Sequence, residues 1–295
     1  MVLPTDTSSF KSVVARVPEI AESADLSIRV LAGGLTNTSY LVDTGAARFV
    51  VRIGCDNGGV LGIDREREEE AVRRAEAAGI APEILLFTQP EGHLVTRYIE
   101  GALSLPIAEF TAPAMVVRIA SRLRDVHSLA AMDGRFDPYA DIRRWMDLIE
   151  TRGTTQPTRL GPLLSVVNRT EHERALVSRS ALVLCHNDPY HLNFLDDGTL
   201  WLIDWEYAGM GEAMYDLAGI ARVLDEDGRD LLLESYFGSV EPEMRQDLDA
   251  LIPVFVCWNV VWCLVEMDGG VAGFDYSNLA EELLDRLPAT GSGPG

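Results

Sequence analysis

Two stretches of this sequence decide how the chain folds: HNDPYHLN at residues 186–193 and IDWE at residues 203–206. The apolar runs 181–185 and 200–203 lead into them, and DDG at 196–198 has the composition of a hairpin turn. The pattern predicts two short strands connected by a turn. The polar residues of both stretches then lie in loops at strand ends, which makes these loops candidate functional segments.

The polar residues of the two loops have the chemistry of phosphoryl transfer. Asp188 can accept a proton, and Asn193 and Asp204 offer oxygen ligands for Mg²⁺. Transfer from ATP needs positioning and charge neutralisation more than covalent help. The H-x-D-x4-N spacing with a later Ile-Asp-aromatic is typical of the catalytic and metal loops of kinases, with Asn187 in place of the usual arginine. The simpler alternative is that these polar residues only shape a turn.

A zinc site is a second alternative for the same stretch. His186, Asp188 and His191 form an H-x-D-x2-H cluster, and a catalytic zinc needs three such ligands and an open position. The other histidines, His93, His127 and His172, stand singly, and none has the spacing of a ligand pair. The rest of the chain therefore favours phosphoryl transfer.

Composition narrows the possible classes of protein. The chain has 295 residues with 47% hydrophobic content, enough for a full core, and a net charge of -21. This charge repels nucleic acid and acidic membranes and would attract a cationic substrate, although it can equally serve solubility. No apolar run reaches the ~20 residues of a membrane span, and the start lacks a signal pattern, so we expect a cytoplasmic protein. The four cysteines have no C-x-x-C spacing and are expected to be reduced.

The region before residue 100 reads as a small sheet with one helix. Strands are predicted over 27–31, 39–42 and 48–53, and GGLTN at 33–37 forms a turn whose backbone amides could approach a phosphate. Charged residues at i,i+4 spacing then predict a helix over 64–78 that ends at a glycine. Lys11 is the only lysine, so arginine must supply every later cation.

After the expected hinge at Gly101, helical spacing of apolar residues dominates. Helices are predicted over 114–129, 171–177, 227–236 and 244–267, and the Thr-, Pro- and Gly-rich segment 151–165 is predicted to be a mobile connection. We therefore expect an N-terminal lobe over residues 1–100 and a helical lobe over residues 101–295.

With these pieces in order, the chain resembles the choline/ethanolamine kinase branch of the aminoglycoside phosphotransferase-like kinases, from about residue 31 to 267. The segments that carry the resemblance are GGLTN at 33–37, VVRI at 50–53, IDRERE at 63–68, APE at 81–83, HND at 186–188 with Asn193, and IDWEY at 203–207. The arginine in VVRI, where kinases usually have lysine, is typical of that branch. The resemblance implies an α+β, two-lobed protein-kinase-like fold that binds ATP and Mg²⁺.

The resemblance also implies roles for particular residues. Asp188 would take the proton of the substrate hydroxyl, and Asn193 and Asp204 would hold Mg²⁺. Arg52, braced by Glu68, would contact the α- and β-phosphates, and backbone amides of Gly33, Gly34, Leu35, Thr36 and Asn37 would cover them. Asp216 matches a family position that stabilises the catalytic loop rather than reacts.

The acceptor is expected to be a small cationic amino alcohol, with choline or ethanolamine favoured. Aromatic faces beside a carboxylate suit such a cation. The candidates are Tyr207, Trp258, Trp262 and Tyr276, with Glu206 and Glu266 as acids. Trp258 and Trp262 are one helical turn apart and could line one pocket, or could simply be core residues. Choline kinases tend to carry Asn and Glu where this chain has Gly219 and Val223.

Two rival functions share much of this pattern. An aminoglycoside or macrolide phosphotransferase would use the same catalytic residues, but its large polycationic substrate would need an open, acid-lined cleft. A catalytically silent nucleotide-binding scaffold would have lost Asp188, Asn193 or Asp204, and all three are present.

Overall fold

The computed structural model describes residues 7–31, 33–176, 181–271 and 273–287, which form two compact units. The first unit takes in the described residues up to Leu105 together with Leu192–Tyr207, and the second takes in Pro106–His191 and the described residues from Ala208 onward. The segment 192–207, which the expected division at residue 100 assigns to the helical lobe, thus packs with the N-terminal residues. It does so because its strands pair there.

The first unit is built on an antiparallel sheet of order β1-β2-β3-β5-β4. Its strands and helices are β1 (Ser27–Leu31), β2 (Thr38–Asp43), β3 (Arg48–Ile53), β4 (Ile84–Phe87), β5 (Leu94–Arg97), α1 (Thr7–Val14), α2 (Pro18–Ala21), α3 (Gly58–Leu61) and α4 (Arg65–Ala77). Apolar residues of β2, β3 and β5 form one core with α1, in which the Phe10 ring meets Tyr40 at 5.0 Å between centroids. This core fixes the sheet on which the predicted nucleotide site stands.

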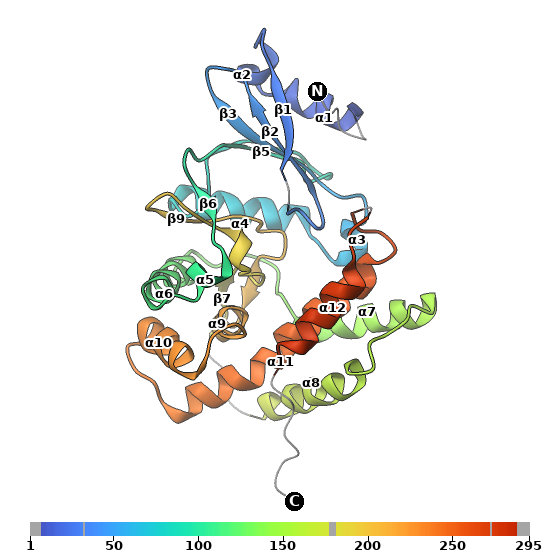
Figure 1. Cartoon of the computed structure of the whole chain (residues 1–295), viewed down its shortest axis with the longest axis vertical. Helices are drawn as coiled ribbons and strands as arrows, with labels where there is room; N and C mark the ends of the chain where they lie inside the picture. Colours follow the sequence, from blue (N-terminus) through green and yellow to red (C-terminus); the bar gives the residue numbers. More distant parts are fainter. Residues whose placement is uncertain (1–6, 32, 177–180, 272, 288–295) are drawn as a thin grey trace, which may run out of the picture. The chain divides into compact units, whose positions relative to one another are not determined.

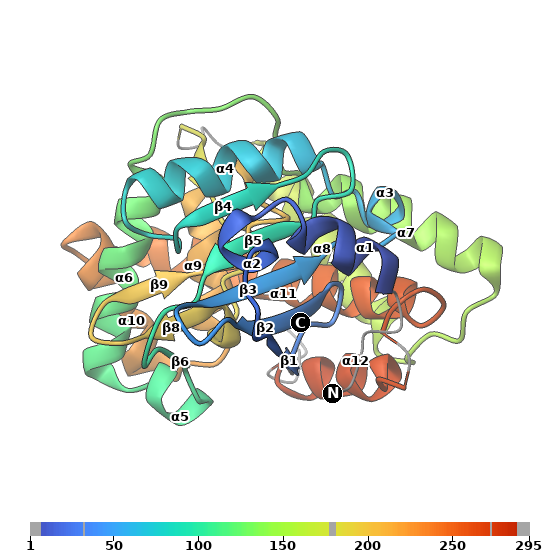
Figure 2. The ribbon, with the colours of Figure 1, turned by 90° about the horizontal axis from the view of Figure 1, so that it is seen from above.

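Helix α4 begins where the sequence predicts because Asp64 caps it, accepting hydrogen bonds from the amides of Glu66 and Arg67. Although α4 is rich in charge, it buries Ala71, Val72 and Ala75, and Figure 2 shows it alongside β4. The face that meets the sheet is therefore narrow and made of small residues. The same helix buries one acid, Glu68, which is only 1% exposed.

A second, three-stranded sheet completes the first unit. It consists of the antiparallel strands β6 (Leu103–Ser104), β8 (Phe194–Asp196) and β9 (Leu200–Leu202). A short 3-10 turn at His191–Asn193 precedes β8. The amide of Leu202 also donates to the carbonyl of Ile80 at 2.9 Å. These bonds attach the segment with the predicted metal ligands to β6 and to the turn that follows α4, both in the first unit.

The second unit is helical around α11, as Figure 1 shows for α11 and α12. Its elements are α5 (Ile107–Phe110), α6 (Pro113–His127), α7 (Pro138–Arg152), α8 (Leu160–Ala175), α9 (Ala213–Ala221), α10 (Glu226–Phe237), α11 (Pro242–Glu266) and α12 (Tyr276–Asp285), with β7 (Val183–Cys185) paired to β10 (Gly209–Gly211). The predicted helices 114–129, 227–236 and 244–267 correspond to α6, α10 and α11, whereas the prediction 171–177 covers only the end of α8, and its residue 177 lies outside the described residues. However, the segment 151–165 is not wholly a connection, because α8 already begins at Leu160 and buries Leu163.

Helix α11 is long and apolar enough to cross a membrane, yet 78% of its most apolar window is buried inside the protein. It packs against α7, α8, α9 and α12. Burial on all sides is what makes its sequence almost continuously apolar, as expected for the central helix of a globular domain. The α+β class with a small antiparallel sheet and a helical unit is confirmed.

Candidate active site

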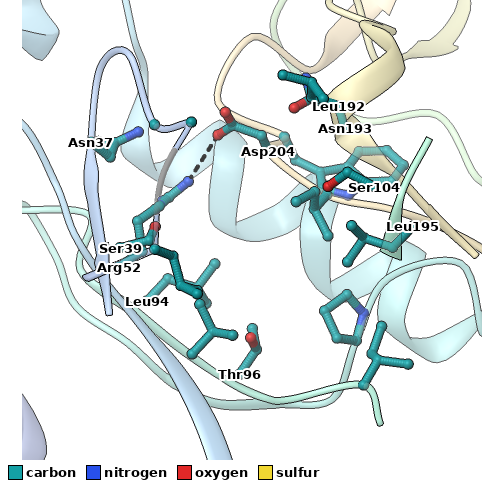
Figure 3. Close-up of a pocket in the computed structure, with 18 of the residues that line it drawn as sticks. Asn37, Ser39, Arg52, Leu94, Thr96, Ser104, Leu192, Asn193, Leu195 and Asp204 are labelled. Atoms are coloured by element: carbon teal, nitrogen blue, oxygen red, sulfur yellow. Dashed lines mark hydrogen bonds and ion pairs between the residues drawn. The ribbon is translucent and has the colours of Figure 1, made fainter. Parts of the chain in front are cut away.

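The first unit contains a cavity of about 390 Å³ that is shaped for a flat apolar group with a charged tail. Figure 3 shows its apolar wall and its polar end, where Arg52 meets Asp204. The wall comes from the two sheets and from the loop after β9, and it includes Leu31, Val50, Leu94, Leu195, Ile203 and Trp205. The polar end is lined by Gly33, Gly34, Asn37, Arg52, Glu68, Asn193 and Asp204. Eight of the residues that sequence reasoning assigned to ATP and Mg²⁺ therefore line one cavity: Gly33, Gly34, Leu35, Asn37, Arg52, Glu68, Asn193 and Asp204.

The cation of the cavity is Arg52 on β3. Its guanidinium forms a close ion pair with Glu68 of α4, lies 3.3 Å from Asp204 Oδ1, and donates to the carbonyl of Gly92 at 3.1 Å. Arg52 is 8% exposed and Glu68 1%, so both charges are desolvated and hold one another in place. Burial alone would lower the pKa of Arg52, but the charges of Glu68, Asp204 and Glu206 raise it above its ordinary value. Arg52 is therefore a permanent, oriented cation.

A second buried arginine, Arg65, extends this pair into a network that sequence reasoning missed. Arg65 Nη1 lies 2.6 Å from Glu68 Oε2 and 3.4 Å from Glu206 Oε2. Glu206 in turn accepts a hydrogen bond of 2.7 Å from the side-chain amide of Asn37. The available signal was helical spacing, because Arg65 precedes Glu68 by three residues and must share its face of α4.

This network changes the expected role of Glu206. The residue is 3% exposed, and its carboxylate is shared between Asn37 and Arg65 within the first unit. Burial, and next the charge of Asp204, raise the pKa of Glu206 to about 7 against the opposing effect of Arg52. Glu206 thus links the glycine turn to the loop of Asp204, and its carboxylate is not placed as an open acid for a cation.

The turn at 33–37 has the backbone that a phosphate-covering loop requires. A Cβ on Gly34 would lie 2.3 Å from the carbonyl oxygen of Asn37, and Gly33 has a φ of 105°. Only glycine fits both positions without displacing the backbone. The Asn37 side chain donates to Glu206 and accepts a hydrogen bond of 3.1 Å from the amide of Cys55, so it is engaged within the first unit.

The two predicted magnesium ligands are held next to one another. The amide of Ile203 donates to the carbonyl of Asn193 at 2.9 Å, which places the residue before Asp204 against the backbone of Asn193. Asp204 has a left-handed φ of 66°, a conformation that aspartate tolerates better than most residues, and its side chain is 37% exposed. One carboxylate and one amide oxygen at the polar end of the cavity fit Mg²⁺, which prefers few protein oxygens beside phosphate oxygens and water.

The loop that carries Asp188 belongs to the second unit and is held in place by hydrogen bonds to Asp216. The fully buried Asp216 carboxylate accepts the backbone amides of His186 at 2.8 Å and Asn187 at 2.7 Å. Asn187 adopts a left-handed φ of 65°, and Asp188, half-buried, follows at the end of this tight segment. The expectation that Asp216 stabilises the loop agrees with these bonds.

The zinc alternative gains no support from the described residues. The three-ligand group found there consists of His127, Cys185 and Asp216, whose candidate atoms lie within 4.8 Å of one another. His127 Nε2 lies 3.0 Å from Asp216 Oδ2, and His127 Nδ1 lies 2.6 Å from the hydroxyl of Tyr236. Both ring nitrogens are therefore already engaged in hydrogen bonds. Burial raises the pKa of the Cys185 thiol well above its ordinary value, which disfavours the thiolate that a metal needs. The cluster is a structural support for the loop.

The aromatic residues that are candidates for binding the cationic group of the acceptor lie in different surroundings. Trp258, 1% exposed, packs against Trp145 at 5.0 Å between ring centroids and donates its indole N–H to Asp141 at 3.3 Å. Trp262, 8% exposed, instead meets Tyr276 edge-on at 5.9 Å. The two tryptophans therefore contact different aromatic partners, and Trp258 is a core residue. Tyr207, 4% exposed, ends the segment that belongs to the first unit.

Comparison with known proteins agrees with this geometry. The model of the "Phosphotransferase enzyme family" matches residues 27–251. Protein LicA of Haemophilus influenzae is 28% identical over 277 residues, which cover 87% of this chain and 79% of LicA. A choline/ethanolamine kinase family protein from Mesorhizobium loti has a TM-score of 0.79 and 26% identity, covering 95% of this chain and 92% of its own.

Choline kinase LicA from Streptococcus pneumoniae has the same fold, with a TM-score of 0.77 and 23% identity over 95% of this chain and 99% of its own. A LicA structure in complex with AMP is also similar, with a TM-score of 0.73 and 22% identity over 94% and 96% of the two chains. From the family match, the fold and the cavity together, we conclude that this chain belongs to the phosphotransferase enzyme family and is a phosphotransferase of the choline/ethanolamine kinase type.

Proposed function

We propose that this protein is an ATP- and Mg²⁺-dependent kinase that phosphorylates the hydroxyl group of a small amino alcohol, with choline or ethanolamine as the favoured acceptors. The observation that carries the proposal is the buried Arg52–Glu68 pair, joined to Asp204 at the polar end of an apolar cavity. An apolar slot beside a fixed cation suits a base and its phosphates. The AMP complex of the related LicA supports nucleotide binding.

The residues of the first unit would bind and orient the nucleotide. Arg52 would contact the α- and β-phosphates, held in place by Glu68, and the backbone amides from Gly33 to Asn37 would cover the phosphates. Asn193 and Asp204 would hold Mg²⁺, which when bound neutralises charge on the phosphate oxygens. No further chemistry is required of the first unit.

The residue of the second unit that would act on the acceptor is Asp188. In the reaction, the acceptor hydroxyl oxygen forms a bond to the γ-phosphorus, the bond from that phosphorus to the β–γ bridging oxygen breaks, and ADP leaves. The hydroxyl proton passes to the Asp188 carboxylate. Asp216 keeps the Asp188 loop in place through the amides of His186 and Asn187.

For the amine end of the acceptor we favour Trp262 and Tyr276, with Glu266 one helical turn beyond Trp262. The two rings lie 5.9 Å apart edge-on, and Glu266 is 1% exposed on the same helix. Rings beside a buried acid attract a small cation, each contact contributing roughly 0.5 to 2 kcal/mol. Tyr207 remains a proposed contact, whereas Glu206 and Trp258 are engaged elsewhere.

A panel of acceptors tests the proposal against its nearest rival, an aminoglycoside or macrolide phosphotransferase. We expect turnover with amino alcohols and none with the antibiotics, whose size and charge would need an open acidic cleft. We also place the enzyme in the cytoplasm, without nucleic-acid or membrane partners, in keeping with its charge of -21. Turnover of antibiotics alone would replace our acceptor assignment with that of the rival.

The catalytic role of Asp188 is tested by Asp188→Asn, which keeps the shape and removes the base. We expect kcat to fall by roughly 10²- to 10⁴-fold, while the Kd for ATP changes little, because the cavity lies in the first unit. Asp227→Asn, an exposed acid in the first turn of α10, is the matched control and should keep wild-type kcat. Equal kcat values for both variants would remove Asp188 from the mechanism.

A further inference from the structure

The loop that carries Asp188 is connected to a distant helix by a series of three hydrogen bonds. Asp216 Oδ2 accepts the amide of His186 at 2.8 Å and lies 3.0 Å from Nε2 of His127, the last residue of α6. On the other side of the ring, His127 Nδ1 lies 2.6 Å from the hydroxyl of Tyr236 on α10. The series therefore runs from α10 through α6 and α9 to the loop, entirely within the second unit.

The partners of His127 determine which ring nitrogen carries a proton. As an ionised carboxylate Asp216 can only accept, so Nε2 has to donate to it. Burial raises the pKa of Tyr236 to about 12, and Cys185 and Asp216 act in the same direction. Arg124 opposes this effect only in part, so the hydroxyl keeps its proton at neutral pH. Among the described residues, Nδ1 is the hydrogen-bond acceptor for that proton, and the ring is neutral with its own proton on Nε2.

Loss of the tyrosine donor would leave this arrangement of protons undetermined. An imidazole can move its proton from Nε2 to Nδ1, and the lone pair of Nε2 then faces the Asp216 carboxylate, where two acceptors repel one another. The same carboxylate accepts the amides of His186 and Asn187, whose bonds fix the tight segment before Asp188. A wrong tautomer of His127 therefore disturbs the carboxylate that holds the loop of the catalytic base.

We propose that the hydroxyl of Tyr236 positions the catalytic loop by holding His127 in its Nε2–H tautomer. The ring in this state supports Asp216, and Asp216 in turn places Asp188 for the acceptor hydroxyl. This inference rests on the proposed kinase function and adds a residue to it. Because Tyr236 acts through two other side chains, it is a positioning residue and not a catalytic one. The alternative is that its hydrogen bond only helps α10 to pack against α6.

Tyr236→Phe removes the hydroxyl and keeps the ring. With choline or ethanolamine as acceptor, we expect kcat to fall by about 10- to 100-fold, because a small displacement of a catalytic group has an effect of this order. The KM and the Kd for ATP should stay as in the wild type, since the nucleotide loses no contact. Nitrogen-15 NMR of the histidine rings should show His127 with its proton on Nε2 in the wild type and partly on Nδ1 in Tyr236→Phe.

His127→Gln separates positioning from packing. A glutamine amide can donate to Asp216 in place of Nε2, and it has no second nitrogen to which the proton could move. In the His127→Gln background, Tyr236→Phe should therefore have little further effect on kcat, whereas a packing role would give the same loss in both backgrounds. Phe237→Leu is the control and should keep wild-type kcat. The Phe237 ring meets that of Tyr236 edge-on at 4.6 Å but offers no hydroxyl to His127.

Three results would overturn the inference while the kinase function stands. The first is wild-type kcat in Tyr236→Phe, and the second is a loss of kcat that is the same with His127 and with glutamine at that position. The third is a His127 proton that stays on Nε2 when the tyrosine hydroxyl is removed. If the wild type phosphorylates no amino alcohol, the proposed function falls, and the NMR measurement still decides whether Tyr236 fixes the tautomer.

Discussion

Replacing Glu68 by glutamine tests whether the buried ion network holds the first unit together. The substitution keeps the size of the side chain and removes one negative charge that two guanidinium groups share, from Arg52 and from Arg65 at 2.6 Å. All three side chains are less than 10% exposed, so water cannot replace the lost charge. Breaking a buried pair of this kind typically costs about 3 to 5 kcal/mol.

The structure places this variant near the lower end of that range. Arg52 keeps Asp204 at 3.3 Å, and Arg65 keeps Glu206 at 3.4 Å, so neither arginine loses every acidic partner. We therefore expect Glu68→Gln to lower the free energy of unfolding by about 3 kcal/mol. For a chain of this size the melting temperature should fall by roughly 6 to 12 °C. The Kd for ATP should rise as well, because Arg52 loses the acid that orients it.

Differential scanning calorimetry and ATP titration measure both effects on the intact protein. Glu70→Gln is the matched control: it lies on the same helix, two residues away, and its pair with Arg74 is an exposed i,i+4 contact at 2.5 Å. Such pairs contribute about 0.3 to 0.5 kcal/mol, so the control should lower the melting temperature by no more than about 2 °C. If Glu68→Gln and Glu70→Gln have the same melting temperature and the same Kd for ATP, the buried network does not support the site.

Three further changes have expected outcomes. Burial raises the pKa of Glu206 to about 7 from 4.5, so the stability that its neutral form contributes is complete below about pH 4.5 and is lost as the pH rises through 7. Glu206→Gln should flatten this part of the pH dependence of the free energy of unfolding. An unchanged slope would contradict the assignment to Glu206. A Cβ on Gly219 would lie 2.7 Å from a ring carbon of Phe255, so Gly219→Ala should destabilise the protein by about 1 to 3 kcal/mol in thermal unfolding, whereas Gly161→Ala, with open space around it, should not. Asp204→Asn should weaken ATP binding at least tenfold with Mg²⁺ present and much less without it, by titration calorimetry; equal losses in both would argue against a metal ligand.

Several parts of the site could be predicted because they lie in short segments whose spacing has one physical interpretation. The order of Asp188, Asn193 and Asp204 along two strand-flanked loops predicts the phosphotransferase chemistry, and the family comparison confirms that class. The lack of any lysine after Lys11 predicts that an arginine supplies the cation of the cavity, and Arg52 with Glu68 does lie there.

Other features depend on contacts between residues far apart in the chain. Glu206 is followed in sequence by an aromatic residue, as an acid in a cation pocket could be. Its partners Asn37 and Arg65, however, lie more than 100 residues away along the chain. Trp258 and Trp262 share a helical face by spacing, yet α11 is surrounded by helices, so residues one turn apart contact different neighbours. No local sequence pattern could distinguish a residue that lines a binding pocket from one that is buried among other side chains.

The sequence by itself determined the class of chemistry, most of the elements and the residues that carry charge, because local spacing, turn residues and composition act over a few residues at a time. Only the tertiary structure decided how each buried charge is compensated: Arg52 and Arg65 share the buried acid Glu68, whereas Arg222 packs against the rings of Tyr190 and Phe255. Compensation depends on burial and on partners brought together by the packed core, and a buried charge is costly enough that each such partner matters for function.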